Sequence, residues 1–147
     1  MATITPVKIT ESGITSSLAT CAAAGDDFTN TGVEFVRIQN YHATATYSIK
    51  IEAQTTSYKH PQYGVLTKSN IYKTIAPPGN SQSTSANVGA TSAIFGPFKQ
   101  ASFNDANNKV KIYYKTGTGA DETAWNALGT TLAGTHLLKI EVLYLDN

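Results

Sequence analysis

Two neighbouring stretches in the last third of the chain decide the fold class. Residues 96–105 read Gly-Pro-Phe-Lys-Gln-Ala-Ser-Phe-Asn-Asp, and residues 109–115 read Lys-Val-Lys-Ile-Tyr-Tyr-Lys. In the first stretch, Gly-Pro favours a bend and Asn-Asp favours a turn. In the second, apolar residues alternate with lysine and tyrosine at the two-residue period of a half-buried strand. Together they predict a small all-β domain with no catalytic motif at this point.

The first stretch is interpreted as a structural corner. Its aromatic rings can close one end of a β-sandwich, because burying apolar surface stabilises by about 25 cal/mol per Å². Gly permits a close turn and Pro stiffens it, while the last two residues form the turn before the next strand. The corner is predicted to consist of Phe95, Gly96, Pro97, Phe98, Phe103, Asn104 and Asp105.

Strand-like segments recur along the chain with turn signals between them. Residues 47–53 alternate, which places one face on the core and the other in water, and residues 40–43 are a plausible hairpin connection before them. Residues 136–145 predict a central strand that is buried on both faces for part of its length. This spacing predicts an antiparallel β-sandwich or jelly roll. The other candidate strands are 33–39, 71–75 and a segment beginning at 94–95.

One helix and several loops complete the expected domain. Residues 121–128 are the one helix candidate, since Asp121 can cap the N-terminus and Gly129 can end it. Residues 55–64 and 81–92 are predicted to be loops, and Gly25 with two Asp predicts a turn. Residues 1–20 alternate weakly and are predicted to be an extended N-terminal arm or an edge strand. Residues 21–147 then form a single β-sandwich domain.

Composition argues against several classes of protein. Only 14% of the 147 residues are charged and the formal net charge is +1, which disfavours nucleic-acid binding through phosphates. No apolar run approaches the ~20 residues of a membrane span, and the N-terminus has no signal-peptide pattern. Cys21 is the only cysteine, so neither an intrachain disulfide nor a cysteine metal cluster can form.

No arrangement of chemically active residues points to an enzyme. His42, His60 and His136 lack metal-ligand spacing. The oxygens of 26–27 and 104–108 could hold a cation, but the calcium-loop pattern is missing and turn chemistry is the alternative interpretation. Neither a Gly-x-Ser-x-Gly nucleophile motif nor a phosphate loop occurs. We therefore expect no catalytic residues, no metal and no cofactor.

Three side chains crowd the predicted loop 55–64, and they are Tyr58, His60 and Tyr63. Exposed aromatic rings stack on sugars or anchor protein interfaces. The alternative is that a long loop packs its own aromatic rings against one another.

Several motifs together resemble one group of proteins. Residues 25–35 look like a GD-x-F-x-N-x-G-x-x-F opening, and Asn40 with 47–53 fits the next strand. The later motifs are Pro78-Gly79, Gly96-Pro97-Phe98, Phe103-Asn104-Asp105 and the strand 110–114. Over residues 25–115 the chain resembles small virion structural proteins of tailed bacteriophages, in particular capsid decoration (cement) proteins. The segments 58–72 and 81–92 are longer than that pattern needs, and the helix candidate lies outside it.

The resemblance implies a non-enzymatic protein that binds and stabilises the outer capsid lattice. Its partner would be the major capsid protein of the same virion, and it would itself be a homo-oligomer, a trimer or a dimer. It would be assembled in the host cytoplasm and reside on the capsid surface. The arm is expected to contact the lattice through Ile4, Val7, Ile9 and Ile14. The alternatives are a head–tail neck or tail component, and a carbohydrate-binding or host-adhesion module that uses Tyr58, His60 and Tyr63.

Overall fold

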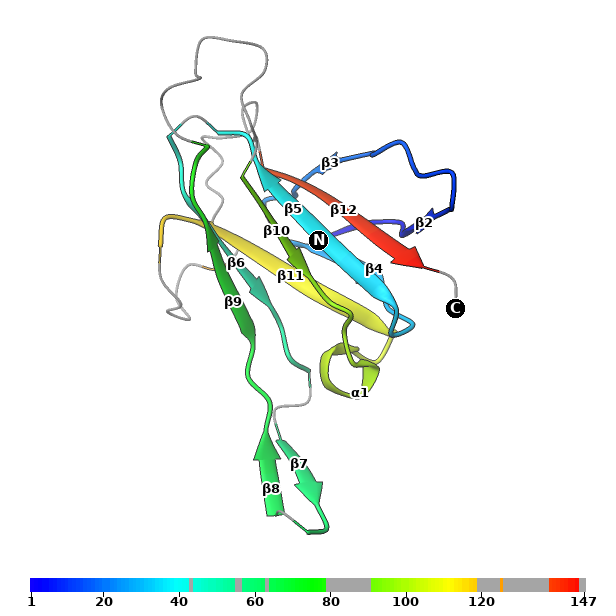
Figure 1. Ribbon diagram of the computed structural model, residues 1–147. Helices are drawn as coiled ribbons and strands as arrows, with labels where there is room; N and C mark the ends of the chain where they lie inside the picture. Colours follow the sequence, from blue (N-terminus) through cyan, green and yellow to red (C-terminus); the bar gives the residue numbers. More distant parts are fainter. Residues whose placement is uncertain are drawn as a thin grey trace.

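The computed structural model describes residues 1–42, 44–54, 57–62, 64–78, 91–118, 125 and 138–145. Within these residues the chain forms two larger mixed sheets, a separate two-stranded hairpin and one short helix (Figure 1). The all-β prediction is confirmed.

The first sheet has the strand order β1-β4-β11-β6-β9. Only the contact between β1 and β4 is parallel, and the other neighbours are antiparallel. Its strands are β1 (Ala2–Thr3), β4 (Asp26–Thr29), β6 (Tyr47–Ile51), β9 (Ile71–Ile75) and β11 (Lys109–Thr116).

The second sheet has the order β10-β5-β12-β2, and a further short strand, β3, also pairs with β12. Here β2 runs parallel to β12, whereas β3, β5 and β10 pair antiparallel with their neighbours. The strands are β2 (Val7–Ile9), β3 (Ala19–Thr20), β5 (Glu34–Asn40), β10 (Thr91–Phe95) and β12 (Leu138–Leu145).

One hydrophobic core takes residues from both larger sheets. Alternate residues of β5 and β11 face it, as the two-residue period predicts. Its fully buried members include Phe28, Val36, Ile38, Tyr47, Ile49, Ile51, Val110, Ile112, Tyr114, Leu138, Ile140 and Val142. The central-strand prediction for the C-terminal segment is confirmed, because β12 lies inside its sheet and is buried on both faces from Ile140 to Val142.

The prediction that β6 exposes one face to water is wrong. Ser48 and Lys50, on the face opposite the core, are both buried. The Lys50 ammonium group lies 4.9 Å from the ring centre of Tyr113 and 5.4 Å from that of Trp125. Trp125 therefore shelters a face that the alternating pattern assigns to solvent, and the cation–π contacts offset part of the cost of burying the charge.

The connection after β5 is not a hairpin, because β5 and β6 belong to different sheets. The Asn40 side chain organises this crossing. Its amide nitrogen donates to the carbonyls of Ala45, Ile75 and Ala76, and its oxygen accepts from the His42 N–H. Buried side-chain bonds of this kind replace the backbone ladder of a hairpin.

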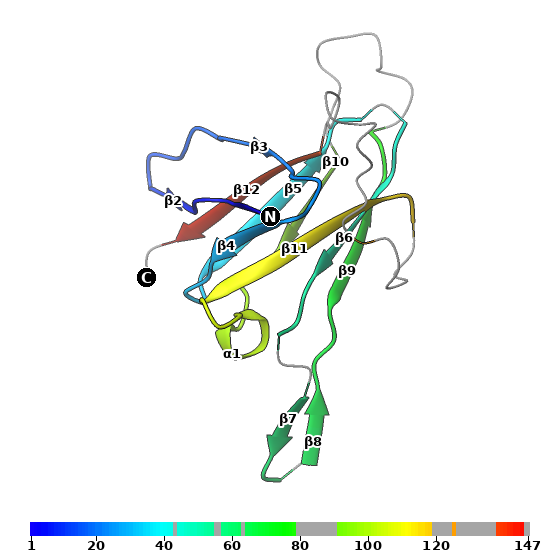
Figure 2. The ribbon, with the colours of Figure 1, turned by 180° about the vertical axis from the view of Figure 1, so that it is seen from behind.

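Two further local predictions are corrected, and a third lies almost entirely outside the described residues. Asp26 and Asp27 begin strand β4, and the turn lies just before them, where the Gly25 N–H donates to the Ala22 carbonyl. Much of the predicted loop 55–64 is a hairpin of β7 (Ser57–His60) and β8 (Gly64–Thr67), which projects away from the larger sheets (Figure 2). The described helix is α1 (Gln100–Phe103), inside the predicted corner, whereas of the helix candidate 121–128 only Trp125 is described.

The N-terminal twenty residues form short strands at the edges of the two larger sheets of the same chain. Their strands β1, β2 and β3 pair with β4 and β12, and Ile4 packs against the core. Within the residues that the structure describes, no helix is long and apolar enough to cross a membrane.

Gly13 and Gly25 allow the cost of a left-handed backbone to be compared with and without a steric clash at an added Cβ. Gly13 and Gly25 have φ values of +85° and +87°, and a Cβ at Gly25 would lie 2.6 Å from the Ile112 carbonyl oxygen, whereas one at Gly13 would meet nothing within 4 Å. We expect Gly13→Ala to lower the free energy of unfolding by about 1 kcal/mol through backbone strain alone. Gly25→Ala should cost at least about 1 kcal/mol more, because β11 must also shift. Urea unfolding of both variants measures the difference, and equal losses would contradict it.

Candidate functional site: an apolar sheet face and a structural corner

The predicted corner is a buried aromatic cluster. The ring centres of Phe28 and Phe98 lie 5.8 Å apart, and those of Phe98 and Phe103 lie 5.6 Å apart. Phe95 is also buried, while Pro97 is exposed beside it. At Gly96, φ is +111° and an added Cβ would lie 2.6 Å from the Glu34 carbonyl oxygen, so only glycine fits. The segment packs two sheets together.

The polar end of the corner is a turn and an amide cluster. An Asp105 carboxylate oxygen accepts from the backbone N–H groups of Asn107 and Lys109. These hydrogen bonds, of which the one from the Lys109 N–H has the largest effect, hold the pKa of Asp105 below its ordinary value. Asn104 exchanges side-chain bonds with Asn30. Asp105 and Asn104 are thus engaged in folding interactions.

Neither the histidines nor the acidic residues assemble a metal site among the described residues. His42 accepts the N–H groups of Thr44 and Ala45 on Nδ1, so it organises the turn between the two sheets. His136 lies outside the described residues, and for His60 the structure gives the backbone position in β7.

Asp26 is a buried carboxyl group in the core. Its Oδ2 accepts from the Tyr114 hydroxyl at 2.8 Å and from the Ala22 N–H at 3.1 Å, while Oδ1 has no hydrogen-bond partner among the described residues. Burial raises the pKa of Asp26 above its ordinary value, and the two hydrogen bonds offset this only in part. Burial also raises the pKa of the neighbouring Cys21 thiol, which keeps that thiol protonated and unreactive.

The outer face of the second sheet carries a row of apolar side chains. Strand register places Phe35 beside Leu143, and Leu143 beside Val7, while Leu145 pairs with Ile9. Ile94 lies one row away, at the edge strand β10. Exposure reaches 68% for Ile94, 49% for Leu145 and 36% for Val7. We call this surface the apolar face, and define it as Val7, Ile9, Phe35, Ile94, Leu143 and Leu145.

Three polar side chains, those of Ser16, Arg37 and Glu141, border the apolar face at one end. Arg37 forms an ion pair with Glu141, and the Ser16 hydroxyl lies between them as acceptor from Arg37 and donor to Glu141. Glu141 is buried by these contacts. Ser16 thereby holds the loop between β2 and β3 over this end of the sheet. At the other end Leu145 is exposed, while Phe35 and Leu143 are half-buried.

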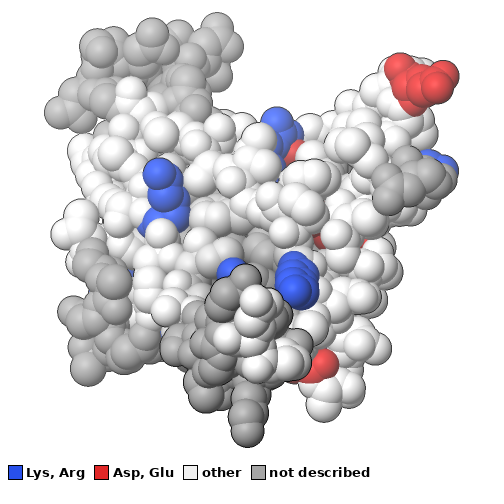
Figure 3. Space-filling view, turned by 60° about the horizontal axis from the view of Figure 1, so that its bottom comes forward, with Lys and Arg blue, Asp and Glu red and all other residues white. Residues whose placement is uncertain are grey.

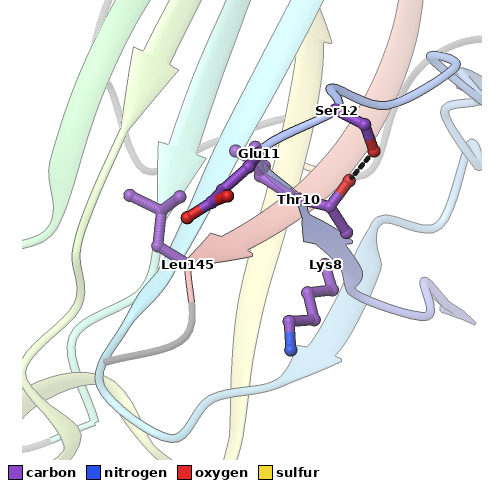
Figure 4. A pocket seen from close by; sticks show the side chains of 6 residues that line it. Lys8, Thr10, Glu11, Ser12 and Leu145 are labelled. Atoms are coloured by element: carbon purple, nitrogen blue, oxygen red, sulfur yellow. Dashed lines mark hydrogen bonds between the residues drawn. The ribbon is translucent and has the colours of Figure 1, made fainter.

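Two hollows adjoin the apolar face. One, of about 280 Å³, is lined by Gly32, Val33, Phe35, Pro97 and Leu145. The other lies beside the turn that follows β2 (Figure 4), where the hydroxyls of Thr10 and Ser12 bond each other at 3.0 Å and Thr10 donates to the Gly13 carbonyl. The hydroxyls beside the turn thus bond to one another and to the turn backbone. The hollow at Phe35 and Pro97 is an apolar recess that continues the face.

The structure divides the four predicted arm contacts. Val7 and Ile9 belong to the apolar face, whereas Ile4 packs against the core and Ile14 is half-buried in the loop after β2. Of the predicted loop contacts, Tyr58 and His60 lie on β7, and Tyr63 lies outside the described residues.

Sequence reasoning missed Phe35, Leu143, Leu145 and Ile94. A signal was present, since residues 33–38 and 142–145 place apolar residues at both odd and even positions. Such runs are typical of strands covered on both sides. Figure 3 shows another face of the molecule, on which charged side chains are few and separated by uncharged surface, as the low charge content requires.

Comparisons with protein-family models, with curated proteins and with solved structures find no match to this chain. The resemblance to bacteriophage virion proteins therefore rests on the motif residues alone.

The raised pKa of Asp26 has a measurable effect on stability. Because the folded state holds this proton more tightly than the unfolded state, the stabilisation is complete below the ordinary carboxyl pKa and is lost as the pH rises through the raised one. Asp26→Asn removes this titration. From about pH 4 upward, the unfolding free energy of the variant relative to the natural protein should increase by up to about 1.4 kcal/mol per pH unit, until the folded-state pKa is passed.

Urea unfolding of both proteins at a series of pH values measures this difference, in which contributions from all other groups cancel. Parallel curves across the acidic range would contradict the raised pKa.

Proposed function

We propose that the protein is a non-enzymatic structural component of a bacteriophage virion, a capsid decoration protein that binds the outer capsid lattice. Its partner is the major capsid protein of the same particle. The observation that carries the proposal is the apolar face, because a cluster of exposed and half-buried apolar side chains on the outer side of a sheet is a typical protein-docking surface.

The motif residues shared with decoration proteins support this proposal in a different way. Phe28, Phe98 and Phe103 form one ring cluster, and Asn30 bonds to Phe98 and Asn104. Motifs far apart in the sequence thus make one folding unit, which we propose to be the corner of an antiparallel β-sandwich with jelly-roll character. We propose that the motif residues maintain the fold of the scaffold, and that the exposed surface around them makes the contact with the lattice.

The position of the arm refines the expected contact. Val7 and Ile9 of β2 lie next to Leu143 and Leu145 of β12 in the register of the second sheet. Lattice binding through the arm therefore uses a composite surface of both strands. Ile4 contributes to the core instead, so removal of the whole arm would remove sheet contacts as well as binding contacts.

The double variant Val7→Asp with Leu145→Asp tests the lattice contact. Both side chains are at least one-third exposed, so the fold should persist, whereas a charge buried against the capsid should weaken binding at least about tenfold. The measurement is co-sedimentation with capsids of the encoding virus that lack the protein. Thr29→Asp, an exposed position on the first sheet, is the matched control and should bind normally.

Binding that is unchanged in the double variant would contradict this assignment of the contact. Copy number separates a lattice protein from a neck or tail component: quantitative mass spectrometry of virions should give a multiple of the capsomer number, and the copy number of a single ring would contradict the decoration role.

The second candidate is a carbohydrate-binding or host-adhesion module, and the projecting hairpin favours it. β7 and β8 pair only with each other in the described sheets and extend away from the body (Figures 1 and 2). Tyr58 and His60 belong to this hairpin.

A glycan array tests the second candidate. If the hairpin binds sugars, the natural protein should bind a defined set of glycans. Tyr58→Ala with Tyr63→Ala should then reduce that binding about thirtyfold, since aromatic stacking contributes on the order of 1 kcal/mol per ring. Val7→Asp with Leu145→Asp is the control and should leave glycan binding intact. Absence of binding, or binding unaffected by the tyrosine substitutions, would overturn this candidate.

A further inference from the structure

The edges of the two larger sheets are protected unequally. An edge strand presents unpaired N–H and C=O groups, and proteins cover such edges with very short strands, proline or lysine. The ends at β1 and β2 are strands of two and three residues separated by Pro6, and β9 carries the exposed Lys73. β10 reads Thr-Ser-Ala-Ile-Phe over five residues, without charge or proline.

The outer edge of β10 has no hydrogen-bonded strand in the described part of the chain, although β9 of the first sheet lies beside it. β10 pairs with β5 on one side, and no described strand pairs with its other side. A hollow of about 440 Å³ runs beside it, lined by Ser92–Phe95 and by Ile71–Lys73 of the neighbouring edge strand β9. Ile94 is the most exposed large apolar side chain of the described residues, at 68%.

We propose that a second copy of this chain pairs with β10, edge to edge and antiparallel, across a twofold axis. Charge decides between the two longer edges. Self-pairing of β9 about its middle residue would set Lys73 opposite Lys73 of the second copy, and like charges directly opposite each other destabilise a sheet. Self-pairing of β10 about Ala93 sets only uncharged residues opposite one another.

This register makes definite cross-strand neighbours. With Ala93 on the twofold axis, Ser92 of each copy lies opposite Ile94 of the other, and Thr91 lies opposite Phe95. Both pairs occur twice, as a twofold interface requires. The register pairs all five residues of the strand, and any shift from it leaves some of them unpaired.

The pairing has a consequence for the apolar face. A twofold axis perpendicular to the sheet keeps the outer faces of both copies on the same side, so the two second sheets become one continuous sheet. β2 and β12, with Val7 and Leu145, lie toward the far end of each half. The dimer therefore presents two apolar faces in one plane, and bivalent attachment strengthens binding without any new contact. This last step rests on the proposed function, whereas the dimer itself does not.

A charge exchange tests the pairing in the purified full-length protein without capsids. Ser92→Lys with Ile94→Lys sets two lysines opposite each other twice, whereas Ser92→Lys with Ile94→Glu sets a lysine opposite a glutamate twice. Both positions are exposed, so both variants should fold, which circular dichroism checks. Sedimentation equilibrium should give a dissociation constant at least about tenfold higher for the first variant than for the second. Leu145→Lys, an exposed apolar position on β12, is the control and should dimerise like the natural protein.

A natural protein that stays monomeric up to its solubility limit would overturn the proposal, as would equal dissociation constants for the two charge variants. Loss of the dimer in Leu145→Lys alone would place the interface at β12 and not at β10, and would equally overturn it. Because no capsid is present, failure here leaves the lattice-binding proposal standing, and failure of lattice binding leaves the dimer standing.

Discussion

Asn30, at the end of β4, holds together the segment that joins the two sheets. Its side-chain nitrogen donates to the Phe98 carbonyl at 3.0 Å and to Asn104 Oδ1 at 2.6 Å, and its backbone carbonyl accepts from the Asn104 amide. Each buried group left unpaired would cost about 1–3 kcal/mol. The chain leaves the second sheet after β10 and enters the first at β11, so these bonds position the crossing and set Phe98 between Phe28 and Phe103.

A second buried asparagine does the same for the crossing from β5 to β6. Asn40 ends β5 in the second sheet and donates to the carbonyls of Ala45, which precedes β6, and of Ile75 and Ala76 at the end of β9. Two amides at the ends of strands thus set how the sheets are joined. Because each amide has both donors and an acceptor, it can satisfy several backbone groups that no strand pairs with.

Local patterns predicted the strands well where partners lie on one face only. β9 matches the predicted range 71–75, and β11 alternates as expected. The failures come from partners distant in sequence. Lys50 is buried because Trp125, 75 positions away in the numbering, covers it, and no local period encodes that contact. The sequence assigns Asp26 to a turn because Asp favours turns. In the structure its carboxylate lies in the core, where the Tyr114 hydroxyl and the Ala22 N–H donate hydrogen bonds to it. The apolar face was missed because the two-residue period assigns one face of each strand to the core and the other to water, and so predicts no apolar cluster on the outer face.

The composition of β5 bears on why that face exists. Val36 and Ile38 face the core, while Phe35 points to the other side, beside Leu143. Stability alone does not require an apolar residue outside, since polar side chains at such positions cost nothing in water and limit self-association. The loop between β2 and β3 reaches over this side at Ser16, where it covers the Arg37–Glu141 pair. On the same face Val7 and Leu145 stay at least one-third exposed. The described loop thus covers a buried charge, whereas burial of the exposed apolar side chains by a partner would yield free energy, and the proposed docking role uses that surface.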